Sequence, residues 1–427
     1  MNSRKPIYAL LSLGIALIAA LSFVPHTFVG QLHSESETVI GGSMVSSEAV
    51  SGAAIKRSVG APLFDAAAWY VARGEQPETH GVLIESFDGN KVFASHNAEM
   101  AFNPASLIKL STSLVALKKL GAEYRFKTRV FATGEVDKTG ILRGRLYVNG
   151  NDPTFGDAGA AMIAKALRER GIKRISDGIS VSPDFCFNFS DSPQDSGARL
   201  GKALRLGNAP VGIENAPAAG NESLLTVESY PLRDVLLYMN ARSSNFIAEH
   251  LGALVGGASG VQQFLINELK LPASDVTIER TSGREHNRMT PHGLLTVVRA
   301  LVDEAKRQGL QPEDILAVAS DDKGTLRRRL SGTSLEGAVV GKTGTLTQEV
   351  DGGMASLAGI VYTQDAGTIV FAILDQGNKI ADNRQMEDQL LTEVVTSQAM
   401  PRVVASPTPR QFLPPSELRL EGASNSE

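Results

Sequence analysis

The chain has 427 residues, of which 42% are hydrophobic and 21% are charged. This length and composition are typical of a soluble globular protein with two or three domains and room for a large core. The net charge of −4, with no basic stretch interleaved with aromatic residues, argues against a nucleic-acid-binding protein.

The first thirty residues predict either a secretory signal peptide or a membrane anchor. Arg4 and Lys5 precede an apolar run over residues 7–24, and Pro25 follows that run. A positive start before an apolar core is typical of a signal peptide, whereas the length of this run is close to that of a membrane span. Both alternatives predict export to the periplasm or cell envelope, either free or tethered to the cytoplasmic membrane.

Residues 31–60 are rich in Ser, Gly and Ala and lack an apolar period, which predicts a flexible linker. Folded sequence is expected from residue 61. Two short alternating runs, 82–86 and 91–95, flank Phe87-Asp88-Gly89-Asn90, and this pattern predicts a β-hairpin.

A helix is predicted directly after this hairpin, beginning at Pro104, because proline suits a first helical turn. Apolar residues recur at spacings of three and four along it, at Leu107, Leu110, Leu114, Leu117 and Leu120. Gly121 provides a stop. Ser106 and Lys109 fall one turn apart at the beginning of this helix, with Cβ atoms roughly 5–6 Å apart, so an amine lies within reach of a hydroxyl.

From residue 122 to residue 230 the pattern changes to short strands and turns, which we interpret as an inserted accessory domain. Strands are predicted over 126–132, 142–148 and 175–181, a helix over 160–170, and a turn-rich stretch over 190–221. The single cysteine, Cys186, excludes an internal disulfide framework and any CxxC metal or redox site, and its phenylalanine neighbours predict a buried hydrophobic role.

The rest of the chain alternates helices and strands and ends in a tail. Helices are predicted over 232–239, 246–255 and 385–395, a strand near Lys342, and an apolar hairpin over 354–362 and 368–374. Arg327-Arg328-Arg329 is interpreted as a solvated face. The residues after Met400 are rich in proline and polar side chains, which predicts that 399–427 is disordered.

Two short motifs follow the Ser106/Lys109 pair. Ser243-Ser244-Asn245 lies between two predicted helices, and Lys342-Thr343-Gly344-Thr345 starts a predicted strand. Each motif alone is common in loops. A serine-x-x-lysine, a serine-x-asparagine and a lysine-threonine-glycine in this order form the set used by penicillin-binding proteins and class A β-lactamases. Glu336 stands where a phosphate-binding loop would need its first glycine, so that alternative is rejected.

The chemistry of these residues is coherent. The Ser106 hydroxyl is a poor nucleophile until a base takes its proton, and Lys109 can be that base only if burial or a nearby cation lowers its pKa. Lys342 could be that cation or could hold a substrate carboxylate. Asn245 can both donate and accept hydrogen bonds, and Gly344 leaves room for a ligand to approach the backbone.

The motifs and their flanks resemble the D-alanyl-D-alanine carboxypeptidase/endopeptidase family, the peptidase S13 type of low-molecular-mass class C penicillin-binding protein. The segments that carry this resemblance are 103–109, 149–154, 239–249, 287–291, 324–329 and 341–346. The resemblance implies a mixed α/β (α+β) fold, with a penicillin-binding or β-lactamase-like transpeptidase domain made of an antiparallel sheet flanked by helices. Residues 61–121 would rejoin 231–398 in that domain, around the smaller α+β insert over 122–230.

The same resemblance implies a serine peptidase that cleaves peptidoglycan stem peptides through an acyl-enzyme and is inhibited by β-lactams. Ser106 would attack the bond between two D-alanines, Lys109 would take its proton, and Ser243 would relay a proton to the leaving D-alanine. Asn245 would hold the substrate amide. The terminal carboxylate would bind Lys342, Thr343 and Thr345 beside Gly344, and the oxyanion would bind the backbone N–H groups of Ser106 and Thr345. No metal or organic cofactor is expected.

Two features depart from the family pattern. The first two motifs lie closer together than usual, which predicts a shortened insert, and Ser282-Gly283-Arg284-Glu285-His286 replaces a segment that usually reads Ser-Gly-Leu-Ser-Arg. No role is carried over to that segment. Three histidines, His250, His286 and His292, are predicted to be structural or exposed, because no serine elbow or metal-ligand spacing accompanies them.

Two other functions remain as alternatives. A β-lactamase would need a base for rapid deacylation, and no glutamate is identifiable in that role. A catalytically silent wall-binding scaffold on the same fold would have no need for all five of the residues Ser106, Lys109, Ser243, Asn245 and Lys342.

Overall fold

The computed structural model describes residues 60–207, 210–217, 223–412 and 420–421. The predicted signal peptide or anchor lies outside these residues, as does the predicted linker except for its last residue. Within the described ranges, no helix is both long enough and apolar enough to cross a membrane.

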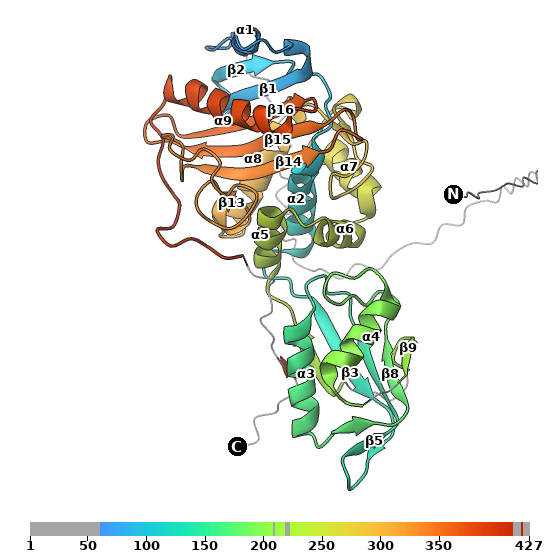
Figure 1. Ribbon diagram of the computed structural model, residues 1–427. Coiled ribbons are helices and arrows are strands. Elements are labelled where there is room, and N and C mark those ends of the chain that lie inside the picture. The colour runs from blue at the N-terminus through green and yellow to red at the C-terminus, as the bar shows by residue number, and fades with distance from the viewer. Residues whose placement is uncertain (1–59, 208–209, 218–222, 413–419, 422–427) are drawn as a thin grey trace, which may run out of the picture. The chain divides into compact units, whose positions relative to one another are not determined.

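The first sheet is antiparallel and combines strands from both ends of the described chain (Figure 1). In the order β13-β14-β15-β16-β1-β2, its strands are Ala317–Val318, Val339–Leu346, Met354–Tyr362, Thr368–Gln376, His80–Ser86 and Val92–His96. The two predicted hairpins are confirmed as β1/β2 and β15/β16. Strand β1 pairs with β16 along its whole length, so a segment before the serine helix and a segment near the end of the chain form the middle of one sheet.

Side chains on the two faces of this sheet, which alternate along each strand, belong to two different apolar cores. Leu83 and Val370 point into a core shared with α2 (Ile108–Leu120) and α8 (Pro291–Arg307). Val82 and Phe371 point into the other core, which includes residues of α9 (Ile380–Thr396). Both faces are therefore covered by helices, as an antiparallel sheet needs when it is buried on both sides.

The serine helix has the predicted form. It begins as a 3₁₀ turn, η2 (Ala105–Leu107), continues as α2, and ends at Gly121, whose φ of 86° follows a last turn that contains Lys118 and Lys119. The leucine stripe is buried except at Leu120, which is partly buried. The helix packs against α8 and against three further helices, α5 (Leu232–Arg242), α6 (Asn245–Leu254) and α7 (Gly257–Asn267). This packing fixes the start of α2 relative to the start of α6.

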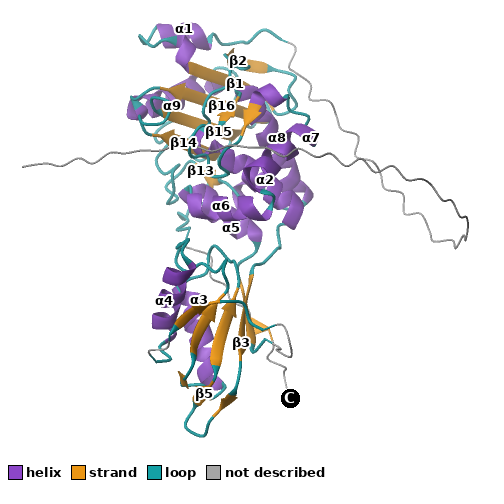
Figure 2. Ribbon diagram, turned by 90° about the vertical axis from the view of Figure 1, so that its right-hand side faces the viewer, coloured by secondary structure: helices purple, strands orange, loops and turns teal. Residues whose placement is uncertain are grey.

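The insert has its own apolar core and a mixed sheet, to which residues 420–421 add an edge strand. In the order β17-β10-β3-β6-β8-β9, its strands are Leu420–Glu421, Leu225–Glu228, Lys127–Ala132, Arg145–Asn149, Gly178–Val181 and Val211–Ile213. A three-stranded sheet joins β4 (Glu135–Val136), β5 (Ile141–Arg143) and β7 (Arg174–Ile175). Helices α3 (Asp157–Glu169) and α4 (Pro193–Leu204) cover one face of the larger sheet (Figure 2).

Two strands predicted in the insert are each divided in two. The run 142–148 changes sheets at Gly144, where a Cβ atom would stand 1.9 Å from the carbonyl oxygen of Thr133. The run 175–181 is divided at Ser176 and Asp177, before Gly178 with its φ of 114°. Glycine permits both changes of direction, and the apolar pattern did not reveal them.

The turn-rich interpretation of 190–221 was wrong for its first half, which contains α4. Ser192 caps this helix by accepting a hydrogen bond from the N–H of Asp195, and Pro193 occupies its first turn. These are ordinary helix-start signals. The prediction of disorder over 399–427 was also wrong in part, because Phe412 is 8% exposed and Arg410 forms an ion pair with Asp322 at 2.7 Å.

The remaining elements are short. They are α1 (Ala66–Val71), η1 (Pro77–Thr79), η3 (Ala273–Asp275), η4 (Pro312–Asp314), β11 (Val276–Thr277) and β12 (Arg288–Met289).

Candidate active site

Ser106 stands on a tight turn at the beginning of the serine helix. Asn103 accepts a hydrogen bond through Oδ1 from the N–H of Ala105 at 3.1 Å. Ala105 has a φ of 51°, a left-handed conformation that is uncommon for a residue with a side chain. Such local strain is typical of functional sites, and here it directly precedes the candidate nucleophile.

Lys109 is fully buried below this serine. Its Nζ lies 3.0 Å from Oγ of Ser106, 2.7 Å from Oδ1 of Asn245 and 2.5 Å from the carbonyl oxygen of Ser282. A neutral amine has two N–H donors and one lone pair. It can therefore donate to the last two oxygens and accept the hydroxyl proton of Ser106.

The pKa of Lys109 is suited to that role. Burial lowers it from 10.5 to about 7, the carboxylate of Glu249 opposes this shift, and the guanidinium of Arg284 adds to it. A lysine with a pKa near neutrality is often uncharged at physiological pH, as a general base must be.

Ser243 and Lys342 form a second pair. Ser243 ends α5 in a left-handed conformation, with a φ of 53°, and Nζ of Lys342 lies 2.9 Å from its Oγ. The same Nζ donates to the carbonyl oxygen of Thr343 at 2.7 Å. The pKa of Lys342 is also lowered, first by burial and then by the charge of Lys109.

The Lys342 strand lies directly against the serine turn, and Gly344 makes this approach possible. A Cβ atom at position 344 would stand 2.2 Å from Oγ of Ser356 and 2.8 Å from the carbonyl oxygen of Pro104. Ser356 donates to that same carbonyl at 3.0 Å. Gly344 is thus needed for the packing of β14 against η2. This requirement is separate from the room that the glycine leaves for a ligand.

All these groups meet at one cavity of about 550 Å³. It is lined by Ser106, Ser243, Asn245, Thr325, Arg327, Arg329, Thr343, Thr345 and Arg384, and the two buried lysines lie below its wall. The structure therefore brings together the five candidate catalytic residues and the candidate substrate-binding segment 343–345. The sequence motifs predicted this convergence.

Three arginines on this wall were not predicted. Arg384, from α9, donates to Oγ1 of Thr345 at 2.6 Å, and no motif points to it. The interpretation of 327–329 as a solvated face was wrong for Arg329, whereas Arg327 and Arg328 are exposed. Arg327 lines the cavity, and Arg329 has a side chain 11% exposed that forms an ion pair with Glu387 at 2.7 Å.

Sequence reasoning also missed Ser282, whose carbonyl oxygen accepts from Lys109. Gly283 next to it has a φ of 84°, and a Cβ atom there would stand 1.9 Å from the carbonyl oxygen of Ala105. The segment that departs from the family pattern at its last three positions keeps the serine and the glycine that touch the catalytic turn. The match at this serine and this glycine was the sequence signal that could have indicated a role for the segment.

The three histidines to which the sequence assigned no catalytic role, His250, His286 and His292, are not part of the cavity wall. Among the described residues, a group of possible metal ligands, Glu99, Asp275 and His292, has ligand atoms within 4.8 Å of one another, and it shares no residue with the cavity wall.

The insert motif 149–154 is explained by local structure. Oδ1 of Asp152 accepts from the N–H and the hydroxyl of Thr154, at 2.8 and 2.7 Å, and burial raises the pKa of Asp152 to about 6. Cys186 is buried, as predicted, and its thiol donates to the carbonyl oxygen of Asp152. Burial raises the pKa of this thiol to about 12.

Comparison with known proteins identifies a family. The family model described as the D-Ala-D-Ala carboxypeptidase 3 (S13) family matches residues 68–184 and 184–396. Carboxypeptidase Rv3627c of Mycobacterium tuberculosis is 26% identical over 357 residues, which cover 68% of this chain and 74% of that protein. Carboxypeptidase DacB of Mycolicibacterium smegmatis is 26% identical over 342 residues, which cover 65% and 72%.

Solved structures agree on the fold. A structure of the Bd3459 predatory endopeptidase from Bdellovibrio bacteriovorus superposes with a TM-score of 0.66 at 20% identity, covering 79% of this chain and 98% of that one. Penicillin binding protein 4 from Haemophilus influenzae gives a TM-score of 0.59 at 18% identity, covering 73% and 96%. The predicted penicillin-binding fold is thus confirmed. The chain belongs to the D-Ala-D-Ala carboxypeptidase 3 (S13) family and is a hydrolase of that type.

Proposed function

We propose that this protein cleaves the bond between the two D-alanines that end peptidoglycan stem peptides, through an acyl-enzyme on Ser106. The observation that carries the proposal is the contact between Ser106 and a buried Lys109 whose pKa is about 7. This pair supplies both the nucleophile and the base that acyl transfer requires.

In the first step Lys109 takes the hydroxyl proton while Oγ of Ser106 attacks the carbonyl carbon of the penultimate D-alanine. The tetrahedral oxyanion accepts hydrogen bonds from the backbone N–H groups of Ser106 and Thr345. Asn245 holds Lys109 through Oδ1 at 2.7 Å and leaves its amide N–H₂ group for the substrate.

In the second step the C–N bond breaks, and the leaving D-alanine must gain a proton. Ser243 donates its hydroxyl proton to the leaving nitrogen and regains one from the protonated Lys109, either directly or by way of Lys342, whose Nζ lies 2.9 Å from Oγ of Ser243. Lys109 is then neutral again. A water molecule, or another amine, then attacks the ester carbonyl and releases Ser106. Lys109 takes the proton of that attacking molecule and passes it to Oγ of Ser106 as the ester C–O bond breaks, so the base is neutral again and the serine is again a hydroxyl.

The substrate carboxylate has several donors available. Lys342 and the hydroxyls of Thr343 and Thr345 match the role implied by the family resemblance. We add Arg384 and Arg327, because both line the same cavity wall and Arg384 already contacts Thr345. An arginine can bind a carboxylate through two parallel hydrogen bonds.

The same geometry supports inhibition by β-lactams. The Bd3459 endopeptidase has been solved acylated by penicillin G, and we propose that Ser106 here accepts an acyl group in the same way. Both a carboxypeptidase and an endopeptidase present this constellation, so the proposal covers removal of a terminal D-alanine and cleavage of cross-links that end in a D-alanine bond.

We further propose the domain division and location that the sequence suggested. Residues 61–121 and 231–398 would form the peptidase domain, with 122–230 as the accessory insert, and the chain would act after export to the cell envelope. A substrate in the wall and an N-terminal segment of signal or anchor type support this location.

The decisive experiment incubates the purified protein with a stem pentapeptide that ends in D-Ala-D-Ala and measures released D-alanine. Ser106→Ala should abolish release and labelling by fluorescent penicillin, whereas Ser397→Ala, at an exposed serine, should leave both unchanged. Equal labelling of the two variants would refute the acyl-enzyme. Rapid turnover of a chromogenic β-lactam would favour the β-lactamase alternative. A wild-type protein that neither takes up label nor releases D-alanine would favour the catalytically silent scaffold.

A further inference from the structure

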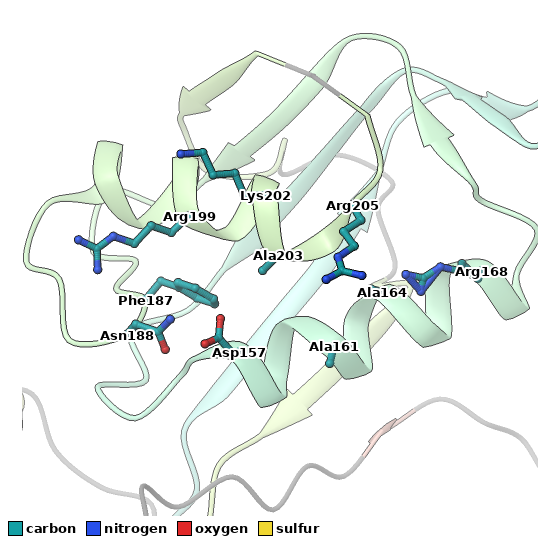
Figure 3. Close-up of a pocket in the computed structure, with 10 residues that line it drawn as sticks. All are labelled: Asp157, Ala161, Ala164, Arg168, Phe187, Asn188, Arg199, Lys202, Ala203 and Arg205. Carbon is teal, nitrogen blue, oxygen red and sulfur yellow. The ribbon is translucent and has the colours of Figure 1, made fainter.

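A second cavity, larger than the catalytic one, opens between α3 and α4 of the insert. Its volume is about 680 Å³ and it shares no lining residue with the catalytic cavity. We call it the α3–α4 groove (Figure 3). It is lined by Asp157, Ala161, Ala164, Arg168, Phe187, Asn188, Arg199, Lys202, Ala203 and Arg205.

Small apolar residues form the floor of this groove. Ala161 and Ala164 line it from α3 and Ala203 lines it from α4, while the buried ring of Phe187 closes one side. Packed helices normally fill the space between them with larger side chains. Alanines at these three positions leave a hollow with an apolar base, of the kind that receives part of a ligand.

Cations line the groove, and most have no anionic partner in the described part of the chain. Arg199 forms an ion pair with Asp195 at 2.7 Å. Arg168, Lys202 and Arg205 form no ion pair with any described residue. Figure 3 shows the guanidinium groups of Arg168 and Arg205 at the same end of the groove, on either side of Ala164. Two neighbouring cations repel each other unless an anion lies between them.

Helix ends account for only part of this arrangement. A cation in the last turn of a helix is favoured by the helix dipole, and this explains Arg168 and Lys202 one at a time. It does not explain why Arg205 follows α4 in a left-handed conformation, with a φ of 54°, which is unfavourable for a residue with a side chain. That conformation directs Arg205 across the groove toward α3 (Figure 3).

We propose that the α3–α4 groove binds a peptidoglycan stem peptide, with a carboxylate of the peptide held between Arg168 and Arg205. The choice of ligand rests on the proposed function. Two guanidinium groups suit a carboxylate, because each can donate two parallel hydrogen bonds. The alanine floor suits the methyl groups of the alanines in such a stem.

The charge pattern favours a peptide over a uniformly anionic polymer. Asp157 lines the groove at the end opposite to Arg168 and Arg205 (Figure 3). Arg199 and Lys202 also lie toward that end, and Arg199 is paired with Asp195 (Figure 3). Among the described residues, Asp157 is the one carboxylate that lines the groove, so it is the group that could receive the amino group of a ligand whose carboxylate binds at the other end. A polyphosphate chain would meet the carboxylate of Asp157 with its own negative charge. The groove would thus bind peptidoglycan while the catalytic cavity cleaves it, and would raise the local concentration of substrate.

The test measures cosedimentation of the full chain with purified peptidoglycan free of attached phosphate polymers, with the catalytic cavity blocked by excess penicillin. The test variant R168E/R205E reverses two groove charges. The control K138E/K165E makes the same change in charge at two exposed lysines of the insert outside the groove. We expect the test variant to bind at least tenfold more weakly than the control. R168K/R205K, which keeps the charge but loses the paired donors, should lie between them.

Two further samples fix the ligand. Glycan strands stripped of stem peptides should bind neither wild type nor control, and raised salt should weaken binding to intact peptidoglycan. Equal binding of R168E/R205E and the control would overturn the proposal. So would equal binding of the wild type to stripped glycan, or binding that requires attached phosphate polymers. D-alanine release, measured on unblocked samples, reports the proposed function separately: its loss leaves the binding result standing.

Discussion

Gly283 packs directly against the carbonyl of Ala105, so closely that a Cβ atom at position 283 would stand 1.9 Å from that oxygen. This contact joins the segment that holds Lys109 through Ser282 to the strained turn that presents Ser106. The nucleophile and its base are therefore positioned by two backbone segments in van der Waals contact.

Gly283→Ala should slow acylation by fluorescent penicillin about 100-fold, because a shift of about 1 Å in either segment misplaces Ser106 against Lys109. Gly309→Ala is the matched control. Gly309 has a similar φ of 77°, but a Cβ atom there meets nothing within 4 Å, so this variant bears only the backbone strain. Equal acylation rates in the two folded variants would show that the contact does not position the site.

The rate of acylation should rise with pH through about 7. Below that pH Lys109 carries a proton and cannot accept another from Ser106, and above it the free amine predominates. The second-order rate constant for a β-lactam, measured from pH 5.5 to 9, should follow a single ionisation. A rate that stays flat across this range would argue against Lys109 as the base.

Glu249→Gln should move this ionisation to lower pH. The carboxylate of Glu249 raises the pKa of Lys109, so its removal lets burial lower that pKa further. The amide oxygen of glutamine can still accept from Thr281 or from the N–H of Ser282, as the carboxylate does now. Glu268→Gln, on an exposed residue, should leave the profile in place. A shift to higher pH would contradict the assigned electrostatic role.

Arg384→Ala should raise the KM for a peptide ending in D-Ala-D-Ala by about tenfold, or about 1.4 kcal/mol, with a smaller change in kcat. The reason is the loss of a cation beside Thr345 on the wall assigned to the carboxylate. The same variant should not change the KM for a peptide whose carboxylate is replaced by an amide. An equal rise in KM for both peptides would mean that Arg384 supports the structure of the cavity wall and does not bind the carboxylate.

Asp152→Asn should change how stability depends on pH. The folded pKa of Asp152 is raised to about 6, so the folded state binds more protons than the unfolded state between about pH 4 and 6. The contribution of Asp152 to the free energy of unfolding is therefore present at low pH and is lost as the pH rises through about 6. This loss is at most about 3 kcal/mol. Urea unfolding at pH 4.5 and 7.5 should show this loss in the wild type and a smaller one in the variant, while Asp321→Asn should behave as the wild type.

The sequence was sufficient to identify the site residues whose role depends on residue type and on spacing along the chain. Ser106 and Lys109 are one helical turn apart, so their contact follows from the periodicity of α2. Lys342 and Ser243 come from distant segments, and only the family pattern indicated that they would meet. Nothing local in the sequence could have indicated that, because their contact depends on how β14 packs against η2 and α5.

The features that sequence reasoning missed depend on backbone contacts or on single side chains without a motif. Ser282 acts through its carbonyl oxygen, which every residue has. Arg384 reaches Thr345 from α9, and the apolar pattern of α9 indicates only which of its residues are buried. The start of α4, by contrast, carried a readable cap at Ser192 and Pro193, and only the many turn-forming residues around it concealed the helix.

The pairing of β1 with β16 has a consequence for how the enzyme is made. A ribosome completes the serine turn early, but the strand that must lie beside His80–Ser86 is synthesised almost three hundred residues later. Loop closure on that scale is slow, and the half-built sheet has an open edge until then. A nascent or truncated polypeptide would thus hold its nucleophile without the second lysine, and acylating power would appear only once the whole polypeptide is available to fold.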